Sequence, residues 1–360
     1  MNSSSLPTNC LPAVYLPQPY YERDSAIIRS AWWAAGLIDL AQSCALPEHK
    51  MLRHTGIFHE DIIQQQHSIC PEQLLQLIHN IIKYSGQNDL SFLFGHQLLP
   101  GNIPHLSHKL NAANNLSELI DCLVQDQMLF SPLLNLRLCY EGDELVIYWQ
   151  DACGADDCFV FLLEALCTAI SSFSRWLNGE RHPWKFYFAH KAPGYIEQYE
   201  VHLQGEIHFE CQRNAMAIQR DYCFQPWQKK SNYRSPSTAD ADADECYFHL
   251  SQQPQPEGQK GFLTEVYNYL HHNISHTPNL EKTAADFGMS SASFKRKLKK
   301  HRSHFQAIYD QVRKDLAVFW INQEGWSSEQ VAKKLHFHDV ANLRRAFKKW
   351  TGMTLWAARN

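Results

Sequence analysis

The sequence predicts two folded parts: an α+β domain over residues 25–227 and an all-α domain over residues 260–360, in which a long helix bridges two helix-turn-helix motifs. Three observations lead to this prediction. The chain has 360 residues, which is too long for one ordinary core. Helical periodicity is followed by alternating, strand-like segments in the first part. A short basic pattern then occurs twice within the last hundred residues.

Residues 1–24 are predicted to form a flexible segment, because they contain four prolines and lack apolar periodicity. Helices are expected next at residues 25–44, 71–84 and 116–128, where apolar residues recur at helical spacing. The second of these begins at Pro71, a residue favoured in the first turn of a helix.

Strand-like patterns begin after the third helix. Residues 134–149 alternate apolar and polar side chains around Glu141-Gly142-Asp143, which predicts a β-hairpin. A helix over residues 158–177, a strand over 184–190, a short helix near Pro193 and two strands within 205–220 are expected in that order. Helices first and a mainly antiparallel sheet afterwards define an α+β domain.

Residues 228–259 are predicted to be a flexible linker, because they are rich in Ser, Asp, Ala, Gln and Pro and lack an apolar rhythm. The charge changes sign across this linker. Residues 260–360 contain 17 Lys and Arg against 8 Asp and Glu, whereas the rest contains 16 against 29. Such asymmetry predicts a module for a polyanion, and nucleic acid is the obvious one.

The repeated pattern reads "FKRKLKKH" at residues 294–301 and "LRRAFKKW" at residues 343–350. Each copy follows a short helical segment and a turn, so each unit reads as helix, turn, helix. With the apolar residues turned toward a small core, the basic residues face outward, as in a recognition helix that enters a major groove. A solvated basic face is the alternative for one such run, but the repetition favours DNA binding.

Local signals support both units. Gly288 is suited to the positive φ that ends a helix, and Ser290 can cap the helix that follows. Ser327 and Gln330 have the spacing of a capping box. Between the units, residues 303–323 carry apolar side chains at helical spacing, and a helix of this length spans about 30 Å. Adjacent major grooves on one side of B-DNA are about 34 Å apart, so one chain could reach both.

These motifs resemble the DNA-binding module of the AraC/XylS family of bacterial transcription regulators over about residues 261–359. The resemblance rests on "LEKTAADFGMSSASFKRKLKKH", "VRKDLA" and "VAKKLHFHDVANLRRAFKKWTGMT". It implies DNA contacts from both predicted recognition helices. The implied residues are Ser291, Ala292, Ser293, Lys295, Arg296, Lys299, Lys300, Val340, Asn342, Arg344, Arg345, Lys348 and Lys349. Arg296 and Arg345 are the best candidates for guanine contacts. The candidates for phosphate contacts are Lys299, Lys300, Lys348 and Lys349.

The chain departs from the family pattern at two positions. His336 stands where the family usually has Gly, and Leu355 where it usually has Pro. Histidine adopts positive φ only uncommonly, so a strained second turn and weaker DNA binding by the second unit are expected.

The first part of the chain, about residues 27–227, more loosely resembles the α+β effector domain of some family members, often called arabinose-binding-like. It implies a small organic effector without implying a sugar, and a second copy of the chain as a candidate partner. RNA polymerase would be a further partner of an activator. Weak candidates for effector binding are Trp33, Phe159, Trp176 and Tyr187, although aromatic residues at these spacings are more often core.

Other functions are less well supported by the sequence. No cofactor-binding, metal-binding or catalytic motif is evident. The histidines near residues 271 and 336 lack the Cys or carboxylate ligands that usually complete a metal site. The eleven cysteines are odd in number and lack a C-x-x-C motif, which fits free thiols in a reducing cytoplasm. A repair enzyme with a methyl-accepting cysteine and a non-specific architectural DNA-binding protein are the alternatives. The expected location is the cytoplasm, at the nucleoid, with no membrane partner.

Overall fold

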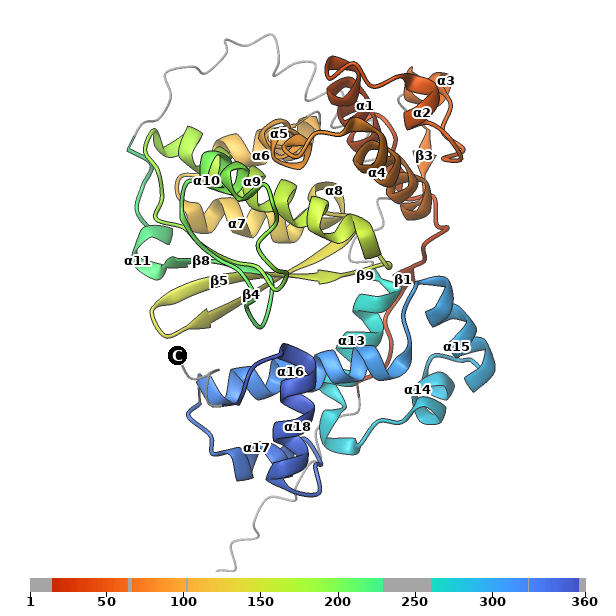
Figure 1. Ribbon diagram of the computed structural model, residues 1–360, viewed down its shortest axis with the longest axis vertical. Coiled ribbons are helices and arrows are strands. Elements are labelled where there is room, and N and C mark those ends of the chain that lie inside the picture. Colours follow the sequence, from red (N-terminus) through yellow and green to blue (C-terminus); the bar gives the residue numbers. More distant parts are fainter. Residues whose placement is uncertain (1–14, 64–66, 102, 229–259, 323, 356–360) are drawn as a thin grey trace, which may run out of the picture.

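The computed structural model of the chain describes residues 15–63, 67–101, 103–228, 260–322 and 324–355. Nearly all of the predicted linker, residues 229–259, lies outside these described residues. So do residues 1–14 of the predicted N-terminal segment. The described residues form two bodies with separate hydrophobic cores, one before and one after the linker (Figure 1).

The first body begins with a layer of helices. These are α1 Trp33–Ser43, α2 Glu48–Met51, α3 His59–Ile63, α4 Pro71–Ser85, α5 Leu90–Leu98, α6 Pro104–Ala112, α7 Leu116–Gln125 and α8 Gln127–Phe130. The predicted helices at 71–84 and 116–128 are confirmed as α4 and α7 with small changes at their ends. Helices α5 and α6 were not predicted.

The predicted helix over residues 25–44 is wrong in its first part. Ile28–Arg29 forms strand β2, which pairs antiparallel with β3, Ser68–Ile69, and helix α1 begins only at Trp33. Ile28 is buried in the core. Because it is followed by aromatic and small residues at nearly helical spacing, the sequence pattern alone does not separate these two conformations.

A five-stranded sheet follows, in the order β4-β5-β8-β6-β7. Its strands are β4 Leu134–Glu141, β5 Glu144–Asp151, β6 Lys185–Tyr187, β7 Glu206–His208 and β8 Ala215–Gln219. The predicted hairpin is confirmed, with Gly142 at a φ of 57° in its turn. All neighbouring strands are antiparallel except β6 and β7, which are parallel. The helices and mainly antiparallel sheet confirm the α+β class of this body.

Helix α9, Phe159–Asn178, is the central core helix of the first body. Two shorter helices complete this body, α10 Ile196–Leu203 and α11 Arg220–Cys223. With the 3₁₀ turn before it, α9 is long and apolar enough to span a membrane by composition, but 78% of its most apolar window is buried inside the structure. Its apolar character is therefore accounted for by burial inside the first body, where it packs against α5 and α10.

The second body is all-helical apart from the two-residue strand β9, Lys260–Gly261. Its helices are α13 Phe262–His272, α14 Leu280–Asp286, α15 Ser291–Lys300, α16 Phe305–Asn322, α17 Ser328–Lys334 and α18 Val340–Thr351. A short 3₁₀ turn, Ile274–His276, lies between α13 and α14. Figure 1 shows α14 and α15 beyond one end of α16, α17 near its other end, and α18 below its middle.

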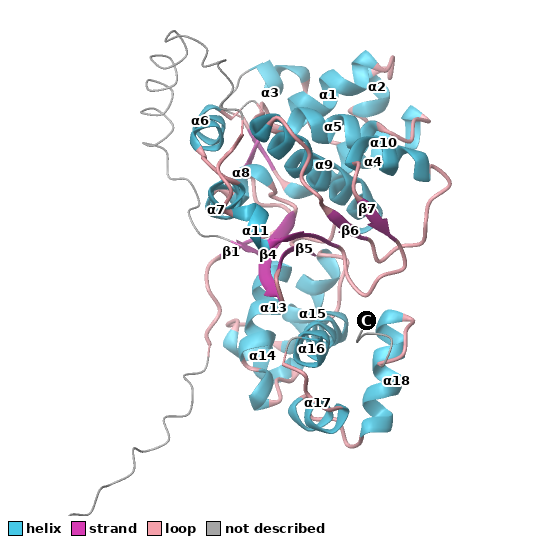
Figure 2. Ribbon diagram, turned by 90° about the vertical axis from the view of Figure 1, so that its left-hand side faces the viewer, coloured by secondary structure: helices cyan, strands magenta, loops and turns pink. Residues whose placement is uncertain are grey.

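The sheet separates the helices of the first body from the second body. Figures 1 and 2 both show α9 on one face of the sheet and α13 and α16 beyond the other face. The backbones come close at Gly154, where an added Cβ would lie 2.3 Å from the carbonyl oxygen of His301. The guanidinium of Arg137 on β4 lies 4.5 Å from the ring centre of Tyr267 on α13. The two bodies are therefore packed together.

Residues 15–24 belong to the segment for which the sequence predicts flexibility, and here they are packed between the two bodies. Strand β1, Tyr20–Tyr21, pairs in parallel with β9. Tyr15 donates a hydrogen bond to Glu265 at 2.9 Å, and Arg23 donates one to the carbonyl oxygen of Gly154 at 2.6 Å. All these contacts are with residues more than a hundred positions away, which local sequence patterns do not reveal.

Candidate nucleic-acid interface

The first helix-turn-helix unit consists of α14 and α15. Gly288 between them has a φ of 69°, a value that a residue without Cβ adopts at little cost. The side chain of Ser290 accepts a hydrogen bond from the backbone N–H of Ser293 and caps α15. Phe294 and Leu298 are fully buried. The predicted turn, cap and apolar anchors of this unit are confirmed.

The second unit consists of α17 and α18. The capping box is confirmed, since Ser327 and Gln330 exchange side-chain to backbone hydrogen bonds of 2.7 and 3.3 Å. His336 has a φ of 59°, so a side chain stands in the left-handed conformation where the first unit has glycine. Leu343 and Phe347 are fully buried and hold α18 against the core.

The burial of these anchors turns the basic edge of each recognition helix toward solvent. Of the thirteen predicted contact residues, nine are exposed: Ala292, Lys295, Arg296, Lys299, Lys300, Arg344, Arg345, Lys348 and Lys349. Four are half-buried: Ser291, Ser293, Val340 and Asn342. Each helix therefore carries its predicted arginine and lysines on one accessible side. In α18, Arg345 also donates a hydrogen bond to Asn342 at 2.7 Å.

The first recognition helix has acidic partners in the N-terminal segment. The ammonium of Lys297 lies 2.8 Å from Glu22, and that of Lys300 lies 2.6 Å from Asp24 and 3.5 Å from Glu22. Burial opposes ionisation of Glu22, but the hydrogen bond and charge of Lys297 outweigh it and lower the pKa of this carboxyl. The hydrogen bond from Lys300 likewise lowers the pKa of Asp24.

Sequence reasoning did not identify this acidic contact. Glu22 and Asp24 lie about 275 positions from the lysines that they meet, in a segment without periodicity. The second recognition helix differs, because none of Arg344, Arg345 and the lysines of α18 forms an ion pair with an acidic residue in the described part of the chain.

The four candidate residues for effector binding do not gather at one place. Trp33 is buried in the helical layer, where its Nε1 donates to the carbonyl oxygen of Leu129. Trp176 is 52% exposed, and Tyr187 stacks on His208 on the sheet. Phe159 lines a cleft between the two bodies. Because the four residues lie apart, their role in effector binding stays a prediction.

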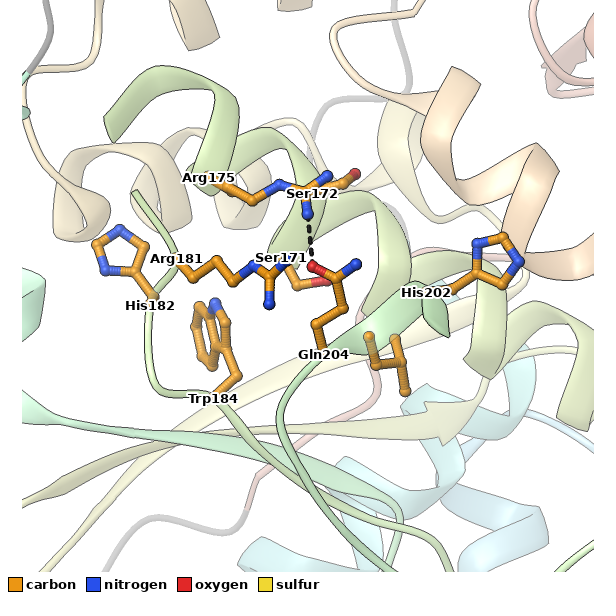
Figure 3. A pocket seen from close by; sticks show the side chains of 9 residues that line it. Ser171, Ser172, Arg175, Arg181, His182, Trp184, His202 and Gln204 are labelled. Atoms are coloured by element: carbon orange, nitrogen blue, oxygen red, sulfur yellow. Dashed lines mark hydrogen bonds between the residues drawn. The ribbon is translucent and has the colours of Figure 1, made fainter. Parts of the chain in front are cut away.

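The described residues include two hollows of very different size. The first lies beside α9 in the first body and is lined by residues such as Arg175, Arg181 and Trp184 (Figure 3). Its volume of about 10 Å³ suits no more than one water molecule, and Arg175 already donates to Gln204 at 2.7 Å. The second is the cleft between the two bodies, with a volume of about 260 Å³.

Several cysteines of the described residues are buried. Burial raises the pKa of the buried thiols, including Cys153 and Cys158, so these groups stay protonated at neutral pH. This agrees with the interpretation of the two cysteines as small apolar residues. A methyl-accepting cysteine would need a lowered pKa, so a repair enzyme is not favoured.

Two helix-turn-helix units with outward basic helices, attached to an α+β domain, define a DNA-binding regulator. Comparison with known families agrees with this class. The model for the arabinose-binding domain of AraC transcription regulators matches residues 46–227, and a helix-turn-helix domain model matches residues 283–360. Because the first match covers half of the chain, the protein belongs to the AraC family of transcription regulators, which are not enzymes.

Known regulators match either most of the chain or about a quarter of it. The chain is 24% identical to the ornithine utilization regulator of Pseudomonas aeruginosa over 278 residues, 77% of this chain and 80% of that protein. It is 27% identical to the regulator GadX of Escherichia coli K12 over 96 residues, 27% of this chain and 35% of that protein. The solved regulator CdpR from Pseudomonas aeruginosa matches with 16% identity and a TM-score of 0.37, over 91% of this chain and 97% of that one.

Proposed function

We propose that this regulator places α15 and α18 in adjacent major grooves of promoter DNA, in response to a small organic effector of its first body. The observation that supports the proposal is the exposed basic edge of each recognition helix, carried by two helix-turn-helix units joined by α16. Helix α16 has 18 residues and spans about 27 Å, close to the groove repeat of about 34 Å.

The residues divide into two roles. Arg296 and Arg345 occupy matching positions and are proposed to contact guanine, since the guanidinium forms two parallel hydrogen bonds with its O6 and N7. Lys299, Lys348 and Lys349 are proposed to contact phosphate, together with Lys300 when it is free of Asp24. Phosphate contacts supply affinity and arginine contacts supply sequence preference.

Footprinting on the DNA that flanks the gene of this protein tests the proposal. The full-length protein should protect almost two helical turns per chain. Arg296→Ala should weaken binding by about 10- to 100-fold, equivalent to about 1–3 kcal/mol, and relax sequence preference in one half of the site. Lys333→Ala, at an exposed position of α17 outside the recognition helices, is the control and should leave the footprint unchanged.

The same experiment separates this proposal from non-specific architectural binding. An architectural protein would bind the flanking DNA and a shuffled sequence of equal length with similar affinity, and both complexes would weaken steeply with salt. A uniform protection pattern, unchanged by Arg296→Ala, would therefore contradict the proposed function.

A further inference from the structure

Figure 2 shows one face of the sheet turned toward the second body. The cleft between the two bodies is lined by residues from both. Its lining comes from strand β5 and nearby loops on one side, and from α13, α16 and the turn after α15 on the other. Helix α16 contributes one face, represented by Ala307, Gln311 and Lys314. The turn contributes Arg302 and Ser303, which directly follow the first recognition helix. A molecule in the cleft would contact both bodies.

The carboxylates of the cleft are already satisfied. Asp315 accepts hydrogen bonds from the Tyr267 hydroxyl at 2.9 Å and from the Gln311 amide at 2.9 Å. Asp151 accepts hydrogen bonds from the backbone N–H groups of residues 153–155. The cleft therefore offers little acceptor capacity to a cationic ligand.

The cationic side chains of the cleft differ in whether they have a carboxylate partner. Arg213 pairs with Glu141, and Arg302 pairs with Asp156 at 2.8 Å. Lys314 has no such partner at hydrogen-bond distance: its ammonium donates to one backbone carbonyl oxygen at 3.2 Å, and the nearest carboxylate oxygen is 4.0 Å away. The Lys314 side chain is only 12% exposed, so water satisfies its remaining N–H groups poorly.

Two further hydrogen-bond donors line the same cleft. The hydroxyl of Tyr148 has no hydrogen-bond partner among the described residues, and burial raises the pKa of Tyr148 to about 12, which keeps this group protonated. The side-chain oxygen of Asn214 accepts a hydrogen bond from the backbone of Ala189 at 2.8 Å, which leaves its amide N–H groups as donors. An ammonium, a phenol and an amide together are suited to a carboxylate.

Most of the rest of the wall is apolar, apart from Gln150 and Ser303. Phe159 and Trp149 belong to the first body, and Leu263 and Ile308 belong to the second. The volume of about 260 Å³ lies just below the usual range of about 300–1,000 Å³ for ligand pockets, so the ligand is of metabolite size. Apolar walls with a few convergent donors are typical of sites for small organic molecules.

We propose that the interdomain cleft is the effector site, and that it binds an organic carboxylate with an alkyl or aryl body, its carboxylate on Lys314. This inference rests on the proposed function, because it names the place and chemistry of the effector in the regulator. The ligand receives all its contacts only when the two bodies are packed as here. It therefore stabilises this arrangement by its difference in affinity between packed and separated bodies.

Binding to the full-length protein without DNA tests this proposal. Benzoate, phenylacetate and hexanoate are compared at equal millimolar concentrations with benzamide, phenylacetamide and hexanamide, which match them in shape but lack the charge. Saturation-transfer NMR and the thermal shift of the protein are the measurements. At least one carboxylate should bind and raise the melting temperature, and its amide should not.

Three variants locate the binding site. Ala307→Trp, which fills the cleft from a solvent-accessible position, should abolish carboxylate binding. Lys314→Met should weaken it at least about tenfold, equivalent to about 1.4 kcal/mol. Lys333→Met removes a lysine outside the cleft and should change nothing.

The proposal is overturned if no carboxylate of the panel binds, if an amide binds as tightly as its acid, or if binding survives Ala307→Trp. Because these measurements contain no DNA, their outcome is independent of the footprint. A specific footprint without carboxylate binding would remove the cleft proposal alone. Carboxylate binding without a footprint would remove the proposed DNA contacts and leave the ligand site.

Discussion

Arg296 and Arg345 occupy matching positions, 49 residues apart, in the two helix-turn-helix units. Both side chains are exposed, but the helices that carry them have different surroundings. Helix α15 meets an acidic N-terminal segment through Lys297, whereas the second unit has Ala346 at the matching position. The first unit turns at a glycine and the second at His336. The same sequence pattern thus gives one recognition helix that is held by the N-terminal segment and a second one that follows a strained turn.

The largest expected effect comes from removing a buried ring in either unit. Phe294→Ala and Phe347→Ala should each cost about 3–5 kcal/mol of unfolding free energy, because both rings are fully buried. Phe294 also contacts Phe262, whose ring lies 5.2 Å from that of Tyr20, so its loss should loosen the N-terminal segment as well. Hydrogen exchange at residues 20–24 measures this difference.

Phe319→Ala in α16 is the control for these two variants, since this aromatic side chain is 37% exposed. Its cost should be clearly smaller. Equal loosening of residues 20–24 by Phe294→Ala and Phe347→Ala would show that the segment is not tied to the first unit.

Lowering the pH should reduce the folding stability of the first unit more than that of the second. His301 is buried, and burial lowers its pKa to about 4, with Lys300 and Arg23 acting in the same direction and Glu22 opposing. The unfolded chain takes up this proton near the ordinary pKa of 6.5, before the folded chain does. The stability that neutral His301 contributes is therefore present at neutral pH and is lost as the pH falls from about 6.5 toward 4.

The position that matches His301 in the second unit is Trp350, which does not titrate. Melting temperatures between pH 7 and pH 5 should fall less steeply in His301→Leu than in the original chain. His304→Leu, at an exposed position just before α16, should keep the original slope. His271, whose pKa burial also lowers to about 4, contributes in both cases, so the slope should be reduced without being abolished.

A smaller effect is expected at the turn of the second unit. His336 has a φ of 59°, and His336→Gly should stabilise the chain by about 1 kcal/mol by relieving this conformation. The reverse change in the first unit, Gly288→Ala, should destabilise by a similar amount, since no atom crowds the added Cβ and only the φ of 69° opposes it. Denaturant unfolding of both variants checks the two signs, and a loss of stability in His336→Gly would contradict the assigned strain.

The smallest expected effect concerns the acidic contact. Glu22→Gln combined with Asp24→Asn frees Lys297 and Lys300, so affinity for DNA should rise by a few-fold at low salt, and log affinity should fall more steeply with log salt. Glu281→Gln, at an exposed acidic residue of α14, is the matched control. An unchanged salt slope in the double variant would show that these lysines do not contact phosphate.

Much of the fold follows from local signals in the sequence. The hairpin at Gly142, the start of α4 at Pro71 and the caps at Ser290 and Ser327 were all predicted, because each depends on a few neighbouring residues. The basic edges of both recognition helices were predicted for the same reason, since helical spacing fixes which side chains oppose the buried anchors. The thirteen DNA contacts themselves stay a prediction.

Other features depend on residues far apart in the chain. Strand β2 at Ile28 needs its partner β3, and the packing of Tyr20 needs strand β9. The contact of Glu22 with Lys297 and the presence of Tyr148 and Lys314 in one cleft likewise join residues more than 150 positions apart. The two bodies and the basic helices of the second body were predictable, because periodicity and capping depend on neighbouring residues. The surfaces that those helices and the sheet face were not predictable, because they depend on how the two bodies pack.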